Sequence, residues 1–378
     1  MPDADILIIG AGPAGLSTAG ALKQAGLASV ILDSGQRIGH SWEQRYDRLH
    51  LHTVRAYSGL AHFAIPRIYP KYLSKDQYAE YLRLYAAHFD LNLMPGKQVK
   101  RVHQVSAAGG RSGWAVDTGS ETWIARLVVI ATGQYNQPIC PEFPGLSQYT
   151  GETLHSSSYN SGLKFQNQHV LVIGAGNSAM EIAVDLVEQG ASQVVISVRS
   201  APPIVPRDFL GTPAQVFGIL MNSLPSAFSD RVGQAFSRLA MGDLGRFGLP
   251  PAAWLPFSAH RTPVIDVGFA AALEAGKISV RPAVSSFTSS GVIYQNNHEE
   301  SFDVVIFATG FRTGLEQLLE PAGLIDKNGI PLFPSGAPTS SPGLYFMGYY
   351  DSLRGFLYES NLASRRLAQE IKSKFDSI

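Results

Sequence analysis

The sequence predicts an α/β fold that contains two separate parallel sheets. Two continuous apolar runs, residues 6–9 and 170–173, are typical of buried parallel strands. Each run leads directly into a glycine-rich turn and then into a helical pattern. The two turns begin 164 positions apart, at Gly10 and Gly174. A strand–turn–helix unit that occurs twice indicates two Rossmann-like domains, each able to bind one dinucleotide.

The first turn is a complete G-x-G-x-x-G motif formed by Gly10, Gly12 and Gly15. Gly10 permits the tight turn, Gly12 lets the backbone approach a pyrophosphate, and Gly15 allows the helix to pack on the strand. We expect the phosphates at the helix N-terminus, where free N–H groups and the helix dipole favour anions. The next predicted strand, 30–32, ends at Asp33, which would accept a hydrogen bond from a ribose hydroxyl. The alternative is a glycine-rich turn without a ligand.

The second turn begins with Gly174 and Gly176 and precedes a second amphipathic helix. The strand that follows, 194–198, ends at Arg199 and Ser200 rather than at an acidic residue. A cation at this position suits a 2′-phosphate, which a carboxylate would repel. This ending therefore predicts NADPH rather than NADH, although Arg199 could also be a solvated residue at a strand end.

The different endings favour different ligands, FAD on the first motif and NADPH on the second. This is the arrangement of the flavoproteins that bind two dinucleotides. Residues 127–133 and 303–310 each predict a buried strand that ends in Ala-Thr-Gly, and such strands carry the chain between the two domains of these flavoproteins. Residues 343–348 predict a last strand of the FAD domain.

We therefore expect an FAD domain formed by residues 1–159 and 301–378, with an NADPH domain, 160–300, inserted between them. Within the insertion, the apolar segment 201–260 predicts helical pieces at 214–223 and 229–241. Four interpretations stay open for this segment: a substrate lid, an oligomer contact, a surface that rests on a membrane, and plain domain packing.

The composition excludes several classes of protein. Thirty basic and thirty acidic residues balance, so the protein lacks the net positive charge that draws in nucleic acid. The single cysteine, Cys140, excludes a disulfide framework, a cysteine-built metal site and a redox pair of cysteines. His50 and His52 are two positions apart, but neither Cys nor a carboxylate adjoins them, and we expect no metal.

The sequence predicts a cytoplasmic protein. Its first residues lack the basic region of a signal peptide, and we find no apolar stretch of the roughly 20 residues needed for a transmembrane segment.

Beyond the glycine motifs, the sequence resembles the flavin-containing monooxygenases. The signature F-x-G-x-x-x-H-x-x-x-Y/F/W of that family is matched by Tyr149, Gly151, His155 and Tyr159, with Tyr149 in place of Phe. Much of the remaining chain is similar to the YUCCA-type branch. The matching stretches are 46–49, 51–52, 69–70, 75–78, 174–181, 185–186, 206–207, 209–211, 242–243 and 261–268, of which the last is the most diagnostic.

The chain departs from the plant-type pattern at three places. Residues 53–55 are Thr-Val-Arg where Leu-Pro-Lys is usual, residues 39–42 read Gly-His-Ser-Trp, and residues 355–357 are Gly-Phe-Leu where Gly-Leu-Leu is common. These positions lie where flavin and substrate would meet. The departures therefore concern the substrate more than the type of reaction.

The resemblance implies an NADPH-dependent flavin monooxygenase that acts on a small-molecule substrate with dioxygen, through a flavin C4a-(hydro)peroxide. In the YUCCA-type branch the reaction is oxidative decarboxylation of an aromatic 2-oxo acid such as indole-3-pyruvate. His52 aligns with an Asn that helps to protect the peroxide in the family, and it is the expected catalytic residue. The alternatives are a core histidine for His52 and simple core packing for Trp42, which is otherwise expected beside the flavin ring.

The expected cofactor-binding residues are Gly10, Gly12, Pro13, Ala14, Gly15, Asp33, Ser34, Arg37, Ser41, Trp42, Leu49, His52, Thr132, Gly133, Gly174, Gly176, Asn177, Ser178, Arg199, Ser200, Thr309, Gly310 and Gly348. Other functions stay open at this point. They are oxygenation of sulfur or nitrogen nucleophiles, Baeyer–Villiger oxidation of ketones, an NADPH-dependent electron-transfer reductase, and a redox sensor without turnover. A homodimer is a further open expectation.

Overall fold

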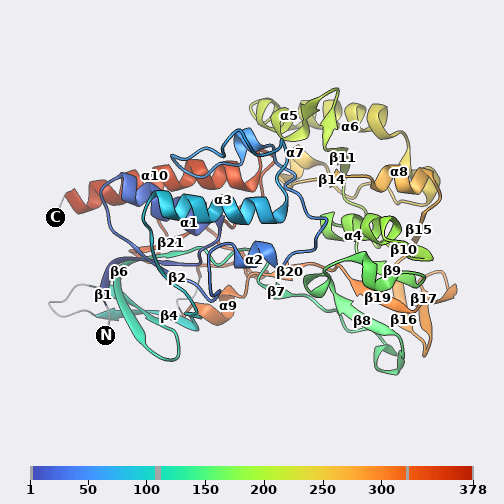
Figure 1. Cartoon of the computed structure of the whole chain (residues 1–378), viewed down its shortest axis with the longest axis horizontal. Helices are drawn as coiled ribbons and strands as arrows, with labels where there is room; N and C mark the ends of the chain where they lie inside the picture. Colours follow the sequence, from blue (N-terminus) through green and yellow to red (C-terminus); the bar gives the residue numbers. More distant parts are fainter. Residues whose placement is uncertain (1–2, 107–111, 321–322, 377–378) are drawn as a thin grey trace. The chain divides into compact units, whose positions relative to one another are not determined.

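A computed structural model describes residues 3–106, 112–320 and 323–376 of the chain (Figure 1). The chain forms two compact units. Unit 1 contains Met1–Gln44, Thr53–Gln137 and Phe311–Ile378, and unit 2 contains Arg45–His52 and Pro138–Gly310. Both units are α/β structures with parallel sheets, which confirms the predicted fold class.

The boundaries between the units differ from the expected ones at three places. Residues 138–159 and 301–310, expected in the first domain, lie in unit 2 because β8 (Glu152–His155) and β19 (Val304–Phe307) pair with each other in its sheet. The short segment Arg45–His52 also lies in unit 2, although both of its flanks belong to unit 1.

Unit 1 is built around a seven-stranded sheet with helices on it. Its elements are β1 (Asp3–Ile9), α1 (Pro13–Gln24), β2 (Val30–Leu32), α2 (His40–Glu43), a 3₁₀ turn (Arg55–Tyr57), α3 (Lys75–His88), β3 (Asn92–Met94), β4 (Arg101–Ser106), β5 (Ser112–Asp117), β6 (Thr122–Ile130), β20 (Phe311–Arg312), α9 (Leu315–Leu318), β21 (Leu344–Phe346) and α10 (Phe356–Asp376). The two-residue strand β7 (Gln137–Pro138) lies at the junction of the units.

The sheet of unit 1 has the strand order β3-β2-β1-β6-β5-β4, and β21 also pairs with β6. The strands β3, β2, β1, β6 and β21 run parallel, whereas β4 and β5 form an antiparallel extension. The helix α1 is buried from Pro13 to Leu22 because it packs on the sheet and also contacts α3 and α10 (Figure 1).

Unit 2 contains the second parallel sheet. Its elements are 3₁₀ turns at Leu146–Gln148, Ser156–Ser158, Gly162–Phe165 and Leu244–Phe247, with β8, β9 (His169–Ile173), α4 (Asn177–Glu188), β10 (Gln193–Ser197), β11 (Ile204–Pro206), β12 (Asp208–Phe209), β13 (Thr212–Pro213), α5 (Ala214–Met221), α6 (Ser226–Met241), α7 (Pro256–Ala259), β14 (Val264–Asp266), α8 (Phe269–Glu274), β15 (Ile278–Arg281), β16 (Val284–Phe287), β17 (Gly291–Tyr294), β18 (Glu299–Ser301) and β19.

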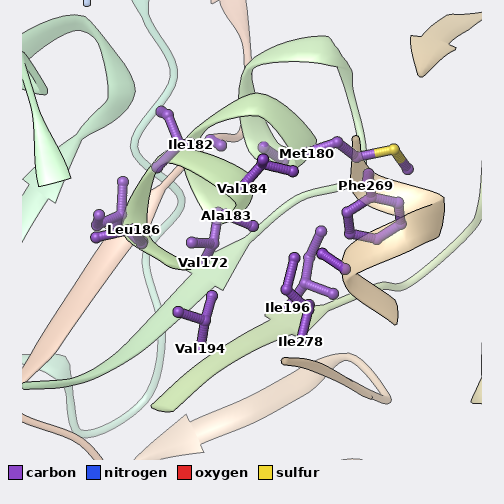
Figure 2. Packing of buried hydrophobic residues seen from close by; sticks show 14 of the residues in the cluster. Val172, Met180, Ile182, Ala183, Val184, Leu186, Val194, Ile196, Phe269 and Ile278 are labelled. Carbon is purple, nitrogen blue, oxygen red and sulfur yellow. The ribbon is translucent and has the colours of Figure 1, made fainter. Parts of the chain in front are cut away.

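The sheet of unit 2 is parallel throughout, in the order β15-β10-β9-β19-β8. Its main core lies between α4, α8 and the strands β9, β10 and β15 (Figure 2). Strand residues such as Val172 and Ile196 pack there against Ile182 and Ala183 of α4 and Phe269 of α8. This packing sets the position of α4, the helix that follows the second glycine turn.

The apolar segment 201–260 contains α5 and α6, close to the helical pieces that the sequence predicts there. Asp230 of α6 is buried and accepts hydrogen bonds from the backbone N–H groups of Phe257 and Ser258, both at 2.9 Å, so it caps α7. Phe228 and Leu239 of the same helix are more than half exposed. None of the described helices is both long and apolar enough to cross a bilayer.

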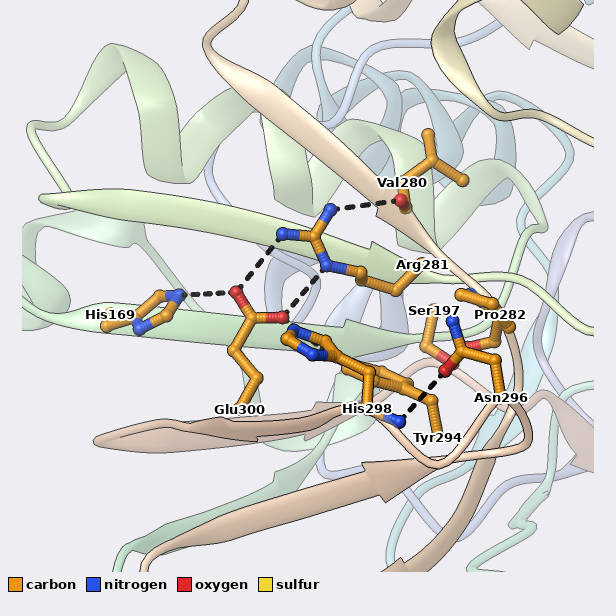
Figure 3. A network of polar contacts seen from close by, with 9 residues as sticks. All are labelled: His169, Ser197, Val280, Arg281, Pro282, Tyr294, Asn296, His298 and Glu300. Atoms are coloured by element: carbon orange, nitrogen blue, oxygen red, sulfur yellow. Dashed lines mark hydrogen bonds and ion pairs between the residues drawn. The ribbon is translucent and has the colours of Figure 1, made fainter.

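A polar network on the hairpin β17–β18 corrects one interpretation of the sequence. The stretch His298-Glu299-Glu300 is typical of a solvated turn, and His298 is indeed exposed. Glu300, in contrast, forms a double hydrogen bond with Arg281, at 3.0 and 3.3 Å, and accepts a third from Tyr294 at 3.0 Å (Figure 3). The strand β18 turns this side chain away from water and so ties the hairpin to the end of β15.

Candidate functional site

In unit 1, the first glycine turn joins β1 to α1 and leaves the end of the helix open. Gly10 has φ +110°, and a Cβ on it would collide with the carbonyl oxygen of Ala131 at the end of β6. A Cβ on Gly15 would collide with the carbonyl oxygen of Gly10. Gly12 is the N-cap of α1 and provides no side-chain cap, and among the described residues nothing lies within 4 Å of where its Cβ would be.

Asp33, at the end of β2, is held by the turn itself. Its carboxylate accepts hydrogen bonds from the backbone N–H groups of Ala11 at 2.5 Å and Gly35 at 2.7 Å. Because each carboxylate oxygen has two acceptor sites, capacity for a ribose hydroxyl is left. Ser34, the next residue, is exposed.

Several other expected residues gather around the same turn. The backbone N–H of Thr132 donates to the hydroxyl of Tyr349 at 3.1 Å, and the hydroxyls of these two residues lie 2.6 Å apart. Burial raises the pKa of Tyr349 to about 12, so its phenol stays protonated. Gly348 packs on Ala14 so closely that a Cβ on it would lie 2.7 Å from the Ala14 Cβ. Gly133 has φ +86°, a conformation that favours glycine.

The short helix α2 and the turn before it carry further expected residues of unit 1, namely Arg37 in the turn and Ser41 and Trp42 in the helix. Arg37 forms a double hydrogen bond with Glu43, at 3.0 and 2.8 Å, and this contact is the main cause that lowers the pKa of Glu43. Ser41 is exposed. Trp42 is half-buried and lies edge-on to Tyr78, with ring centroids 4.6 Å apart. The Tyr78 hydroxyl is buried and has no hydrogen-bond partner among the described residues.

In unit 2, the second glycine turn repeats the geometry of the first. Gly174 has φ +137°, and a Cβ on it would collide with the carbonyl oxygen of Ala308 at the end of β19. Gly176 is the N-cap of α4 without a side-chain cap, again with open space where a Cβ would be. The two turns therefore share one construction: a glycine with positive φ lies against a backbone carbonyl, and a second glycine at the helix N-cap faces open space.

The polar residues near this turn have different surroundings. The side-chain oxygen of Asn177 accepts a hydrogen bond at 2.9 Å from the backbone N–H of Ile265, within the diagnostic stretch 261–268. Arg199 and Ser200 are exposed at the end of β10, and in the described part of the chain no carboxylate pairs with Arg199. The exposed guanidinium of Arg199 thus lies just beyond β10, the strand that pairs with β9, and β9 leads into the glycine turn.

The signature residues Tyr149 and His155 form hydrogen bonds that hold the edge of this sheet together. The Tyr149 hydroxyl donates to the carbonyl of Phe302 at 2.8 Å, which explains how a Tyr fits where Phe is usual. The His155 ring binds the carbonyl oxygen of Gly310 at 3.1 Å, and burial lowers the pKa of this histidine. The hydroxyl of Thr309 donates to the carbonyl of Ile139. Thr309 and Gly310 are therefore held from both sides at the end of β19.

The segment Arg45–His52 lies along α4, on a row of three acidic residues. These residues, Glu181, Asp185 and Glu188, are spaced i, i+4 and i+7 and share one face of the helix. Arg48 binds Glu188 through two hydrogen bonds, at 2.8 and 2.9 Å, and this contact is the main cause that lowers the pKa of Glu188. Leu49 packs against the main core of unit 2.

At the other end of the segment, His52 meets Glu181. The Nε2 atom of His52 lies 2.6 Å from a carboxylate oxygen of Glu181, and the Glu181 side chain is only 2% exposed. The buried phenol of Tyr46 adjoins the same carboxylate. Burial and then the Glu181 charge raise the pKa of Tyr46 well above its usual value, and Ser178 of the glycine turn also reaches it. The partner of His52 is therefore a buried carboxylate from another part of the chain.

Four residues of this cluster were not among the expected site residues: Tyr46, Glu181, Asp185 and Glu188. A signal for them was present, because three carboxylates on one face of a helix that should be buried need partners.

In the described residues, no group of three or more His, Cys, Asp or Glu side chains lies close enough together to hold a metal ion.

Comparison with known proteins agrees with this construction. Residues 7–204 match the family model of pyridine nucleotide-disulphide oxidoreductases. The indole-3-pyruvate monooxygenase YUCCA1 of Oryza sativa subsp. japonica is 36% identical over 94% of this chain and 88% of its own. The probable indole-3-pyruvate monooxygenase YUCCA1 of Arabidopsis thaliana is 34% identical over 93% of this chain and 86% of its own.

Solved structures share the fold over almost the whole chain. The flavin-containing monooxygenase from Stenotrophomonas maltophilia is similar with a TM-score of 0.72 at 22% identity, covering 99% of this chain and 100% of its own. The NADP⁺-bound cyclohexanone monooxygenase from Rhodococcus sp. Phi1 gives a TM-score of 0.74 at 18% identity, covering 99% of this chain and 85% of its own.

The fold and the two glycine turns together define a flavoprotein that binds two dinucleotides. The chain belongs to the flavin-containing monooxygenases, in their YUCCA-type branch. It is an oxidoreductase that depends on FAD and NADPH and uses dioxygen to oxidise a small molecule, as the sequence predicts. The only cysteine is the exposed Cys140, so a cysteine pair within the chain is excluded despite the name of the family model.

Proposed function

We propose that FAD binds at the turn of unit 1, that NADPH binds at the turn of unit 2, and that the substrate is an aromatic 2-oxo acid such as indole-3-pyruvate. The substrate class rests on the relatives named indole-3-pyruvate monooxygenases, which match this chain over nearly its full length. The observation that carries the cofactor assignment is the pair of open helix N-termini, one beside Asp33 and the other beside Arg199.

The two turns fit the groups proposed for them. Gly12 and Gly176 leave space where any other residue would have a side chain, and neither helix has a side-chain cap, so first-turn N–H groups are left for phosphate oxygens. Asp33 would accept from a ribose hydroxyl of FAD. Arg199 would bind the 2′-phosphate of NADPH.

Bound flavin that has received two electrons from NADPH supplies the chemistry that activates dioxygen. The overall reaction consumes the 2-oxo acid, NADPH, dioxygen and a proton, and yields a carboxylic acid one carbon shorter, carbon dioxide, NADP⁺ and water. The bond between the carboxylate and the keto carbon breaks, and one oxygen atom joins the keto carbon. We propose that His52 lies at the reacting oxygen and holds or moves a proton there.

The substrate test is direct. The holoenzyme is incubated with NADPH, dioxygen and indole-3-pyruvate, and indole-3-acetate is measured by mass spectrometry against NADPH consumed. We expect close to one product per NADPH. Rapid NADPH consumption that yields hydrogen peroxide without indole-3-acetate would rule out this substrate. Parallel reactions with methyl phenyl sulfide and cyclohexanone then test the sulfur-oxygenating and Baeyer–Villiger alternatives.

A variant of Arg199 tests the assignment of NADPH to unit 2. We expect Arg199→Ala to raise the KM for NADPH by about 10- to 100-fold, because a charge-assisted contact with the 2′-phosphate contributes roughly 1.5–3 kcal/mol. The KM for NADH, which lacks this phosphate, should change by less than about threefold. An equal rise for both coenzymes would show that Arg199 does not read the phosphate. A cytoplasmic location and a homodimer stay predictions of the sequence.

A further inference from the structure

The closest polar contact of the predicted catalytic histidine is a buried carboxylate. His52 is 22% exposed at its side chain, so part of the ring reaches solvent, whereas Glu181 is 2% exposed. The Nε2–Glu181 separation of 2.6 Å is short for a hydrogen bond of this kind. Nδ1 of His52 has no partner in the part of the chain that the structure describes.

The chemistry of the pair determines which ring nitrogen carries the proton. An ionised carboxylate can only accept, so the hydrogen bond needs a proton on Nε2 of His52. In the neutral ring the other nitrogen, Nδ1, then has a free lone pair and acts as a proton acceptor. In hydrolases that use a catalytic triad, a buried carboxylate binds Nδ1–H of the histidine and orients the ring with Nε2 as the base; here Glu181 binds Nε2, so the roles of the two nitrogens are exchanged.

Arg45, Tyr46 and Arg48, all from the segment of His52, are the charged and titratable groups of that segment that act on this cluster. Tyr46, from the same segment as His52, adjoins the Glu181 carboxylate. Along α4, Asp185 accepts hydrogen bonds from Tyr159 at 2.6 Å and from the backbone of Gly162 at 2.8 Å, and Glu188 binds Arg48. The other two acidic residues of the row thus bind structural partners, and Glu181 alone is bound to a histidine.

We propose that Glu181 is a positioning residue that holds His52 with its proton on Nε2 and leaves Nδ1 as the proton acceptor. This inference rests on the proposed function only for the role of His52 in oxygenation. The tautomer of His52 is a property of the chain itself and can be measured without turnover.

Nuclear magnetic resonance tests the tautomer directly. The holoenzyme with NADP⁺ is labelled with ¹⁵N in its histidines, and two-bond ¹H–¹⁵N correlations show which ring nitrogen carries the proton. The His52 signal is the one that disappears in His52→Asn. We expect the wild-type proton on Nε2, and we expect Glu181→Gln to move a large share of it to Nδ1, because a glutamine amide can donate to Nε2.

Asp185→Asn is the matched control, because it removes a carboxylate from the same face of α4 but leaves His52 and its partner intact. It should leave the His52 signal unchanged. A wild-type proton on Nδ1, or a tautomer that is the same in Glu181→Gln as in the wild type, would overturn the proposal. The wild-type spectrum decides the first point even if Glu181→Gln fails to fold.

Kinetics then separates positioning from a general structural defect. In Glu181→Gln we expect indole-3-acetate formation to fall at least about tenfold, while reduction of the flavin by NADPH stays within about threefold of wild type. Equal losses in both steps would contradict the positioning role. If His52→Leu forms product at the wild-type rate, the proposed catalytic role of His52 fails, whereas the spectra still report on the Glu181–His52 pair.

Discussion

Individual glycines perform two different tasks in the glycine turns. Gly10 and Gly174 have positive φ values and lie against a backbone carbonyl, so the fold of each unit requires them. Gly12 and Gly176 have ordinary φ values of −75° and −80° and face open space, so the fold does not. We propose that glycine is needed at Gly12 and Gly176 because a bound dinucleotide approaches the backbone there.

This difference predicts opposite effects for two neighbouring substitutions. Gly12→Ala should leave the unfolding temperature of the FAD-free protein nearly unchanged and weaken FAD binding at least about 100-fold, because the methyl group occupies the place of the pyrophosphate. Gly10→Ala should destabilise the FAD-free protein by about 1–3 kcal/mol or more, through backbone strain and the collision with Ala131.

Thermal unfolding with and without added FAD measures both effects. The prediction is wrong if Gly12→Ala destabilises the FAD-free protein as much as Gly10→Ala does.

At the scale of elements, the family signature holds a strand pair in place. His155 ends β8 and binds the carbonyl of Gly310 just beyond β19, while the backbone N–H and the hydroxyl of Ser157 lie 3.1 and 3.0 Å from its Nδ1. The carbonyl requires a proton on Nε2 and the Ser157 N–H requires a lone pair on Nδ1, so this ring is neutral. Protonation would break the contact with the backbone N–H.

The neutral state of His155 predicts a pH dependence of stability. Burial lowers the pKa of His155 below its ordinary 6.5, so the unfolded chain binds this proton more readily than the folded chain. The stability that His155 contributes is therefore full above pH 6.5 and is lost as the pH falls through the lower, folded value. His155→Gln should cost about 1–3 kcal/mol at pH 7.5, through lost hydrogen bonds to buried groups, and less at pH 5.

Chemical denaturation of both proteins at several pH values tests this expectation. The wild type should lose more of its free energy of unfolding between pH 7.5 and 5 than His155→Gln does. The half-buried His169, whose pKa burial also lowers, is present in both proteins and cancels in the comparison. Parallel curves for the two proteins would contradict the assignment.

At the scale of the molecule, each unit has its own sheet and its own core, and the chain passes between the units more than once. Arg45–His52 leaves unit 1, follows the acidic face of α4 and returns at Thr53. The predicted catalytic histidine is thus part of the unit with the predicted NADPH turn, although its neighbours in sequence belong to the other unit.

Separate cores predict that the two cofactors stabilise separate units. In differential scanning calorimetry of the FAD-free protein, FAD should raise the transition of unit 1 and NADP⁺ that of unit 2. Each ligand should add about 2.7 kcal/mol at 100 times its dissociation constant. Gly176→Ala should abolish the effect of NADP⁺ and keep that of FAD, and Gly12→Ala should do the reverse. Equal shifts of both transitions by either ligand would contradict this division.

The fold class, the two glycine turns and the family were predictable from the amino-acid sequence alone. Continuous apolar strands, glycine spacing and strand-end residues are local features, and local physics requires them: buried parallel strands are apolar on both faces, and a tight turn against a carbonyl needs glycine. The helices in 201–260 and the strands before Thr132 and Thr309 were predictable for the same reason.

The unit that each connecting segment joins and the surroundings of His52 depend instead on how the chain packs, and only the three-dimensional structure shows them. Glu181 is 129 positions away from His52, and the sequence around either residue does not indicate that the other is its partner. The structure also shows that the Glu300 side chain, 13% exposed, is held in a polar network, and that Asn177 accepts a hydrogen bond from the backbone N–H of Ile265. Such contacts depend on how distant segments pack, because a buried charge must find its partner wherever the fold brings one.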